Sequence, residues 1–284
     1  MNLLDEINET FKKIEQISLH KPKASLKEQA RFGFNEIEKE LAHLHSDSKI
    51  LEIGCGIGLL LGVSANRYHS LKFEGLEPFG DGFHSFKEHN SAIRELGFTI
   101  HNVSYENYKT NKKYDFIYCI NVFEHLSDWK DFIFKMTSML SANGKLLILC
   151  PNYGFPIESH FRIPIIFNKN LTYKFFKNYI KKYEEKTEFQ GLWKSLNFVR
   201  KSQVLSFLRK NKLLFTDYPE INLTMLDRAM HDPNFKKRQR FLFLLGNILK
   251  RLGLVNFMLN LKFLLPYMKI EISSNTPQIN NHQQ

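Results

Sequence analysis

A glycine-rich segment with two nearby acidic residues is the part of this sequence best suited to bind a ligand. The apolar run Ile50–Ile53 leads into Gly54-Cys55-Gly56-Ile57-Gly58, and Glu52 stands two residues before the first glycine. Glycines let a backbone approach a ligand closely, and the start of a helix offers unpaired N–H groups to an anionic group. Glu77 ends the next apolar run, where the ribose of a nucleoside would lie. The pattern therefore predicts a cofactor that contains a nucleoside.

The order of acid and glycines separates two kinds of cofactor. A dinucleotide site needs a glycine at position 59, where this chain has Leu59. The segment resembles instead the glycine-rich turn of the class I S-adenosylmethionine (SAM)-dependent methyltransferases. Residues 114–126 resemble the fourth strand of that family and the loop after it, and residues 144–152 resemble its fifth strand. The resemblance covers residues 45–152 and implies SAM as the cofactor. The cofactor-binding residues expected on this basis are Glu52, Gly54, Cys55, Gly56, Gly58, Glu77 and Asn121.

A second set of polar residues follows the fourth expected strand. Asn121, Glu124 and His125 lie at the end of the strand where doubly wound folds bind their ligands. They resemble the E-x-x-E-H motif with which ubiquinone-type O-methyltransferases and small-RNA 3′-end methyltransferases hold a divalent metal. Asn121 replaces the first Glu and is a weaker ligand, which disfavours a metal here. Without a metal, His125 is a candidate general base for an acceptor hydroxyl, or Glu124 and His125 only pack the loop.

The segment after the fifth expected strand has the composition of a substrate lid. Residues 151–164 combine glycine and prolines with aromatic residues, and they include His160, the third catalytic candidate. Tyr153, Glu158 and Arg162 are further candidates in this segment. The segment resembles methyltransferases of bacterial cell-surface polysaccharide and lipid-linked sugar synthesis. The alternative is an exposed His160 without a role.

The elements that must position these residues follow an alternating pattern. The expected strands are residues 50–54, 73–77, 98–103, 116–120, 145–150, 213–218 and 268–272, and the expected helices between them are 58–66, 83–95, 129–140 and 202–211. Asn143-Gly144 is expected to form the turn before the fifth strand. Strands that alternate with helices indicate an α/β protein with a Rossmann-like, doubly wound, mostly parallel sheet and helical cap insertions.

The expected domain organisation places two insertions late in this sheet. It comprises N-terminal helices (1–45), a SAM-binding core (46–152), a lid and substrate insertion (153–201), a core helix and strand (202–218), a basic, apolar helical insertion (219–267), a last strand (268–273) and a disordered tail (274–284).

The charge distribution points to an anionic partner. Residues 1–150 carry a net charge of −2 and residues 151–284 a net charge of +13. Such a surface attracts an anionic membrane, a phosphate-bearing substrate or nucleic acid, although an AT-rich genome that favours Lys, Asn, Phe and Ile is an alternative cause of the basic composition. No nucleic-acid-binding module is visible, so nucleic acid is not an expected partner. Residues 241–263 are apolar, but Lys250-Arg251 near their middle argues against a membrane span and leaves a helix in the membrane interface.

The cysteines and the N-terminus indicate the cytoplasm. Three cysteines match neither a disulfide framework nor a zinc pattern, and residues 1–11 are acidic, unlike the start of a signal peptide. We therefore expect a cytoplasmic protein, peripheral at the inner face of the membrane if the basic half binds lipid. The function expected is SAM-dependent O-methylation of a glycan or lipid-linked precursor. The alternatives are a soluble methyltransferase for a quinone-like or other small metabolite and a catalytically silent SAM-binding scaffold.

Overall fold

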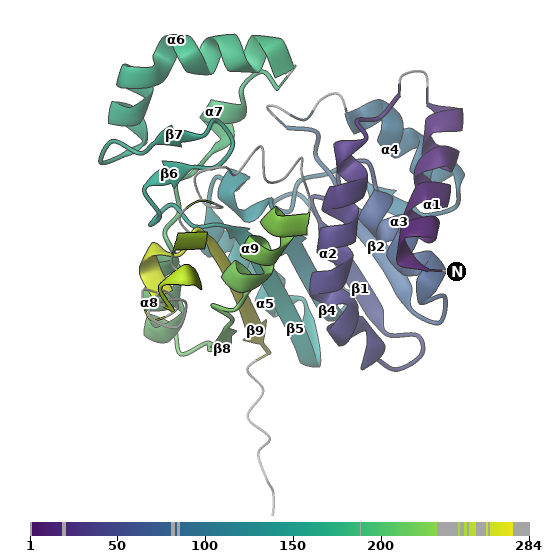
Figure 1. Cartoon of the computed structure of the whole chain (residues 1–284). Coiled ribbons are helices and arrows are strands. Elements are labelled where there is room, and N and C mark those ends of the chain that lie inside the picture. The colour runs from purple at the N-terminus through teal and green to yellow at the C-terminus, as the bar shows by residue number, and fades with distance from the viewer. Residues whose placement is uncertain are drawn as a thin grey trace, which may run out of the picture. The chain divides into compact units, whose positions relative to one another are not determined.

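The computed structural model shows an α/β protein made of two compact units. It describes residues 2–18, 21–80, 83, 86–187, 189–231, 244, 247, 248, 250–253, 260 and 262–274. One unit comprises Met1–Ile120, Asp128–Leu147 and Ile272–Gln284, and the other comprises Asn121–Ser127 and Ile148–Glu271. Seven strands form one sheet in the order β3-β2-β1-β4-β5-β9-β8, as expected for a Rossmann-like, doubly wound fold (Figure 1).

The first unit contains the parallel half of the sheet. Its elements are α1 (Leu3–Ile17), α2 (Ser25–Ala42), β1 (Lys49–Ile53), α3 (Leu59–Arg67), β2 (Lys72–Leu76), α4 (Phe86–Glu95), β3 (Thr99–His101), β4 (Tyr114–Ile120) and α5 (Trp129–Ser138). Strand β1 pairs in parallel with β2 on one side and β4 on the other, with Ile53 level with Leu76 and Cys119. Because parallel neighbours end at the same edge, this register brings the residues that follow β1 and β2 together.

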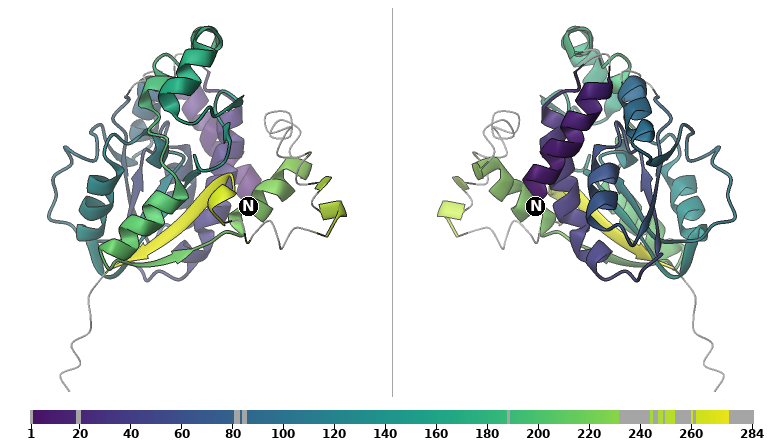
Figure 2. Two further views of the ribbon diagram at one scale, coloured as in Figure 1. Left: turned by 90° about the vertical axis from the view of Figure 1, so that its left-hand side faces the viewer. Right: turned by 90° about the vertical axis from the view of Figure 1, so that its right-hand side faces the viewer.

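Apolar side chains at helical spacing hold α1 and α2 in this unit. Ile7, Phe11 and Ile14 are buried along α1, and Phe34 and Ile37 are buried along α2. They join one hydrophobic core with residues of β1, β4 and α3. Figure 1 shows α1 and α2 side by side. Figure 2 shows the same two helices from two further sides, with α1 beginning near the marked N-terminus. The spacing that predicted N-terminal helices is therefore the spacing that buries them.

The second unit carries the loop after β4 and most of the chain after β5 (Leu140–Pro151). Its elements are η1 (Phe123–His125), β6 (Ile157–Glu158), β7 (Ile163–Pro164), α6 (Lys169–Thr187), α7 (Leu192–Ser195), α8 (Lys201–Lys210), β8 (Leu214–Asp217), α9 (Ile221–His231) and η2 (Lys262–Leu264). Strands β8 and β9 (Tyr267–Ser273) run side by side at one edge of the sheet (Figure 2). The short strands β6 and β7 pair antiparallel and hold the segment between them as a hairpin.

Two sequence expectations need comment. The turn predicted at Asn143-Gly144 is wrong, because β5 (Leu140–Pro151) continues through both residues. A side chain at Gly144 would meet the backbone oxygen of Tyr114 at 2.6 Å, so this glycine serves close strand packing rather than a turn. Most of the predicted basic, apolar insertion, including residues 232–243 and 254–259, lies outside the described residues, as does the tail beyond residue 274. In the part of the chain that is described, no helix is both long enough and apolar enough to cross a membrane.

Candidate active site

The predicted cofactor turn has the backbone geometry that only glycine adopts readily. Gly54, Gly56 and Gly58 have φ values of 69°, 55° and 79°, in the left-handed region. A β-carbon at Gly58 would also lie 2.6 Å from a side-chain carbon of Ile93, so both the backbone conformation and the lack of space require glycine here. The Gly58 N–H donates to the Cys55 carbonyl at 2.8 Å and closes the turn.

Glu77 is tied directly to this turn. Its Oε2 accepts a hydrogen bond from the Gly56 N–H at 2.8 Å, and its Oε1 accepts one from the Phe79 N–H at 2.9 Å. Burial raises the pKa of Glu77, and the two backbone donors oppose that shift. The acid expected at the ribose is therefore held in place by the glycine turn itself.

Glu52 and Cys55 are both buried beside the turn. Glu52 accepts the Tyr118 O–H at 3.0 Å, and burial raises its pKa to about 8. The Cys55 sulfur packs against Gly75 of β2, where a β-carbon would meet it at 2.8 Å. The Cys55 side chain is thus part of the core, and its assignment to the cofactor stays a prediction.

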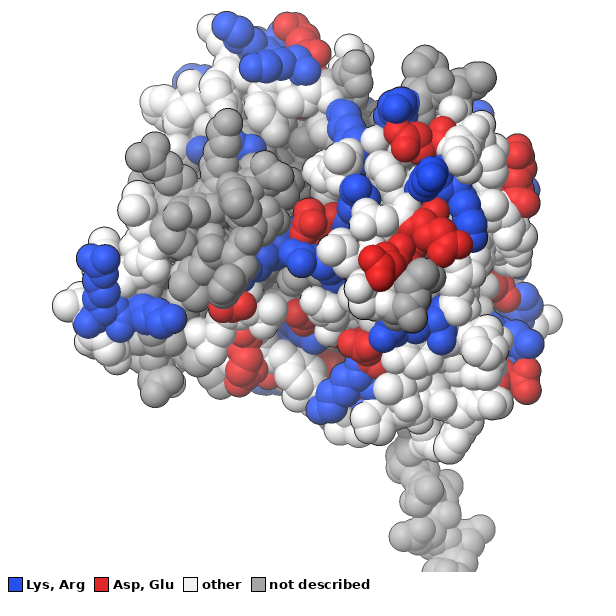
Figure 3. Space-filling view, turned by 45° about the vertical axis from the view of Figure 1, so that its right-hand side comes forward, with Lys and Arg blue, Asp and Glu red and all other residues white. Residues whose placement is uncertain are grey.

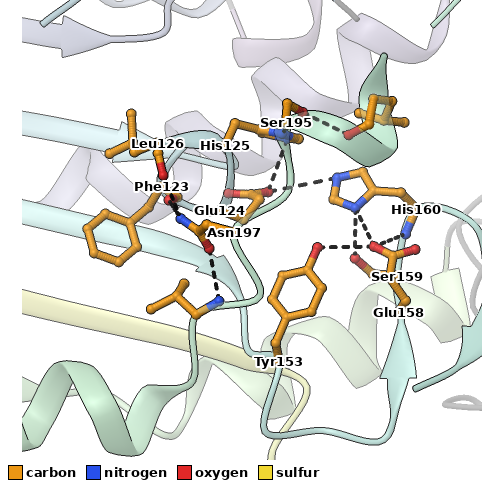
Figure 4. A network of polar contacts seen from close by, with 12 residues as sticks. Phe123, Glu124, His125, Leu126, Tyr153, Glu158, Ser159, His160, Ser195 and Asn197 are labelled. Carbon is orange, nitrogen blue, oxygen red and sulfur yellow. Dashed lines mark hydrogen bonds and ion pairs between the residues drawn. The ribbon is translucent and has the colours of Figure 1, made fainter. Parts of the chain in front are cut away.

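The three catalytic candidates lie together in the second unit (Figure 4). Glu124 and His125 lie on η1, and His160 lies on the hairpin between β6 and β7. Oε1 of Glu124 lies 3.8 Å from Nε2 of His125 and 3.9 Å from Nε2 of His160. The rings of the two histidines meet edge to face, with centroids 5.3 Å apart.

Glu124 stands out within this cluster because its carboxylate is fully buried. Its side chain has 0% exposure, and neither carboxylate oxygen has a hydrogen-bond partner within the part of the chain that the structure describes. Burial raises the pKa of Glu124 to about 7, and the nearby His160 opposes the shift. A carboxyl group that is buried in this way at a strand end is typical of a functional site.

A second acid, Glu158, fixes His160. Its Oε1 accepts hydrogen bonds from Nδ1 of His160 at 2.8 Å and from the Tyr153 O–H at 3.1 Å, and its Oε2 accepts the Phe161 N–H. Burial lowers the pKa of His160, but the charge of Glu158, the hydrogen bond to it and the charge of Glu124 together outweigh burial, and the pKa is raised. The two lid candidates Tyr153 and Glu158 thus contact each other and His160, whereas Arg162 is exposed.

His125 and its loop are held by two residues that the sequence did not point to. Nδ1 of His125 lies 2.8 Å from the Ser195 hydroxyl, at the end of α7. Asn197 donates from its side chain to the carbonyls of Phe123 and Leu126, at 2.8 and 3.0 Å. Burial lowers the pKa of His125 strongly, and the charges of His160 and Lys169 add to that effect. A Ser and an Asn some 70 residues away in the chain carry no motif, so only the fold reveals them.

Asn121 is separate in character from the other candidates. It is exposed, has a φ of 55°, and its N–H donates to the Leu149 carbonyl at 2.8 Å. Its assignment to the cofactor stays a prediction.

Comparisons with known proteins identify the family. A family model described as a methyltransferase domain matches residues 25–203. An uncharacterised Mycobacterium tuberculosis protein is 31% identical over 74% of this chain and 73% of its own length. The chain belongs to the class I SAM-dependent methyltransferases.

Further similarities of this methyltransferase are more limited in extent. The ubiquinone biosynthesis O-methyltransferase of Rickettsia akari is 31% identical over 39% of the chain and 45% of the relative. The structure of Haemonchus contortus phosphoethanolamine N-methyltransferase 2 with SAM matches 87% of the chain at a TM-score of 0.50 and 14% identity, and it supports the fold. The chain spans 53% of that longer structure. The prediction of SAM as cofactor is confirmed.

Proposed function

We propose that this methyltransferase transfers the methyl group of SAM to a hydroxyl of a glycan or lipid-linked precursor at the cytoplasmic face of the membrane. The bond between the SAM sulfur and its methyl carbon breaks, a bond from that carbon to the acceptor oxygen forms, and S-adenosylhomocysteine leaves. The hydroxyl proton is lost in the process. The enzyme contributes alignment, exclusion of water and a site that favours the loss of this proton.

The observation that carries the proposal is the cluster of Glu124, His125 and His160. It offers a buried carboxylate and two imidazole nitrogens within 4.8 Å of one another. These groups accept hydrogen bonds, which suits an acceptor that carries an O–H. The likeness to ubiquinone biosynthesis O-methyltransferases supports oxygen as the methylated atom.

Helix α6 supports the location at a membrane. Leu171, Phe175 and Tyr179 are spaced by four residues along it and are exposed to 38%, 70% and 49%. The exposed lysines of the same helix are Lys174, Lys177, Lys181, Lys182 and Lys186, and Figure 3 shows basic side chains along α6 at the top of the view. Aromatic residues beside lysines on one helix favour binding to an anionic bilayer.

A labelling experiment tests the acceptor class. Purified enzyme and radiolabelled SAM are added to a cell extract that has been separated into lipid, polysaccharide, small-molecule and RNA fractions. Label in lipid or polysaccharide is expected. Label only in small molecules would favour the quinone-like alternative, and label in no fraction together with SAM binding by calorimetry would favour the silent scaffold.

Vesicle binding tests the membrane contact separately. The protein should sediment with vesicles of phosphatidylglycerol and phosphatidylcholine, and it should stay in solution with phosphatidylcholine alone. Phe175→Ser should weaken binding, whereas the matched change Leu214→Ser, at a residue of β8 that is 63% exposed, should not. Equal sedimentation of both variants would contradict the role of α6.

Variants of the histidines test the cluster. His125→Ala and His160→Ala should each lower kcat by about 100-fold or more, the usual range for loss of a group that assists proton transfer. The exposed His45→Ala is the matched control. If both cluster variants turned over the acceptor at the normal rate, the assignment of this cluster to the reaction would be wrong.

A further inference from the structure

The hydrogen bonds around the cluster fit a proton on Nδ1 of each histidine. A Ser195 hydroxyl that donates its hydrogen to the Leu192 carbonyl at 2.8 Å is able to accept from Nδ1 of His125, which is also 2.8 Å away. Nδ1 of His160 likewise donates to the carboxylate of Glu158. A neutral imidazole with a proton on Nδ1 has its lone pair on Nε2. In both rings Nε2 is the atom that lies nearest Glu124 (Figure 4).

Glu124 completes a set of three electron-pair donors. Its carboxylate is buried, and neither oxygen has a hydrogen-bond partner among the described residues. A buried carboxylate without a partner is costly, so it calls for a positive charge beside it. The separations of 3.8 and 3.9 Å exceed a hydrogen bond, and they are longer by about 0.4–0.5 Å than the roughly 3.4 Å between two ligands of a tetrahedral ion at about 2.1 Å.

The geometry points to a binding site for one divalent first-row transition metal ion, with Nε2 of His125, Nε2 of His160 and the carboxylate of Glu124 as ligands. All three ligand atoms lie within 4.8 Å of one another, so the two pairs with Glu124 must close by about 0.4–0.5 Å, and no pair by more than about 1.4 Å, around an ion. Two imidazoles and one carboxylate suit Zn²⁺, Co²⁺ or Mn²⁺ better than Mg²⁺ or Ca²⁺, which prefer oxygen ligands.

The residues behind the ligands fit the same assignment. In metal sites a ligating histidine usually donates its other N–H to a carboxylate, a carbonyl or another acceptor, which fixes the ring and its tautomer. Glu158 does this for His160, and Ser195 does it for His125. Asn197 fixes the η1 loop through two backbone carbonyls. Each ligand that sits on a loop is therefore held by its own partner.

Three protein ligands leave at least one coordination position open, as in catalytic metal sites. This inference deepens the proposed function and depends on it for one step only, in which the acceptor hydroxyl occupies the open position. A bound divalent ion lowers the pKa of an oxygen ligand, so the ion would promote loss of the hydroxyl proton while both histidines act as ligands. Metal binding itself requires no acceptor.

Cobalt binding tests the site directly. The untagged full chain is treated with a chelator, dialysed and titrated with Co²⁺, with the visible absorption of the ion and calorimetry as readouts. One equivalent should bind and give the absorption of a site with nitrogen and oxygen ligands. Added Zn²⁺ should displace it. If the folded chain bound no stoichiometric Co²⁺ and no Zn²⁺, the inference would be overturned.

Variants distinguish this site from surface binding. Glu124→Gln and His160→Ala should each weaken Co²⁺ binding by more than about 100-fold, and Ser195→Ala should weaken it by about 10- to 100-fold, the range for partners of metal ligands. His45→Ala should bind as the unchanged chain does. Circular dichroism establishes that each variant is folded, and the mild Ser195→Ala change keeps the test valid if Glu124→Gln unfolds. Normal Co²⁺ binding by folded Glu124→Gln and His160→Ala would contradict the ligand set.

The outcomes separate this inference from the proposed function. Stoichiometric metal binding that needs Glu124 and His160, without label in lipid or polysaccharide, would support the metal site and refute the acceptor class. Label in lipid or polysaccharide that a chelator-treated, metal-free enzyme transfers at the full rate would support the acceptor class and exclude the ion from the reaction, while the Co²⁺ titration decides whether the ion binds.

Discussion

Replacing Glu52 with glutamine tests whether the cofactor turn carries an acid that destabilises the protein in the absence of cofactor. Burial raises the pKa of Glu52 from 4.5 to about 8, against the opposing hydrogen bond from Tyr118. At about pH 7 this carboxyl is protonated in the folded state and ionised in the unfolded state. One pKa unit corresponds to 1.36 kcal/mol, so taking up that proton costs the folded state about 3 kcal/mol.

The sign of the pH dependence follows from the raised pKa. The cost is absent below the unfolded pKa of Glu52, grows as the pH rises toward about 8, and is constant above it. Glutamine has the same shape, accepts the Tyr118 O–H and does not titrate. Glu52→Gln should therefore lie within about 1 kcal/mol of the unchanged protein near pH 5 and exceed its free energy of unfolding by about 3 kcal/mol near pH 7 and about 4 kcal/mol near pH 8.

Urea unfolding without SAM, followed by circular dichroism in steps from about pH 5 to about pH 8, measures this difference. The exposed Glu95→Gln serves as the matched control and should show a constant difference. Other titrating groups affect both proteins equally, so the difference between them isolates Glu52. A free-energy difference that did not change with pH would refute the reasoning.

The same variant should bind SAM less well. If Glu52 lines the methionine end of SAM, as the family resemblance implies, glutamine removes a charge-assisted hydrogen bond of about 1.5–3 kcal/mol. Calorimetry at about pH 8 should then show SAM binding weaker by about 10- to 150-fold. A variant that is more stable but binds SAM more weakly would show that function, not stability, requires the acid. Unchanged SAM affinity would remove Glu52 from the cofactor site.

Three further substitutions test a close glycine contact in the first unit and two buried polar contacts in the second. Gly58→Ala should lower the free energy of unfolding by at least about 1–3 kcal/mol, because φ is 79° and the new carbon meets Ile93, and an unchanged urea midpoint would contradict this. Asn152→Ala should cost at least about 2 kcal/mol, since two backbone N–H groups and two carbonyls lose a buried partner, and amide exchange at Lys201 should accelerate. The buried ammonium of Lys201 lies 2.6 Å from Oδ1 of Asp217. Lys201→Met should lower the free energy of unfolding by about 3–5 kcal/mol because it removes the partner of this carboxylate, and adding Asp217→Leu should recover much of that loss in urea unfolding.

The elements that the sequence predicted well are those in which one local pattern determines the structure. The alternation of apolar runs and helical spacing located β1, β2, β4 and the helices between them to within a few residues. The glycine turn was predictable because Gly54, Gly56 and Gly58 need a backbone conformation that other residues avoid. The same local reasoning failed at Asn143-Gly144, because a close approach to Tyr114 also requires glycine and leaves no different signal in the sequence.

The candidate site was only partly predictable because its parts are joined by tertiary contacts. Glu124, His125 and His160 were recognisable as residue types near strand ends. That His160 comes next to Glu124 depends on the hairpin between β6 and β7, whose strands have only two residues each. Ser195 and Asn197 act through single hydrogen bonds from a short helix and the loop after it. No spacing rule connects them to His125, so sequence patterns could not reveal them.

The expectation about metal depends on spacing along the chain. Judged as E-x-x-E-H, the stretch lacks a ligand at Asn121, and a metal is therefore disfavoured. In the structure Asn121 is exposed and has a φ of 55°, in the left-handed region. The third group beside Glu124 and His125 is His160, from a different segment. A coordination sphere requires three atoms at the right separation, whatever their order in the sequence. The replacement at Asn121 therefore does not decide whether an ion binds, and the Co²⁺ titration of Glu124→Gln and His160→Ala does.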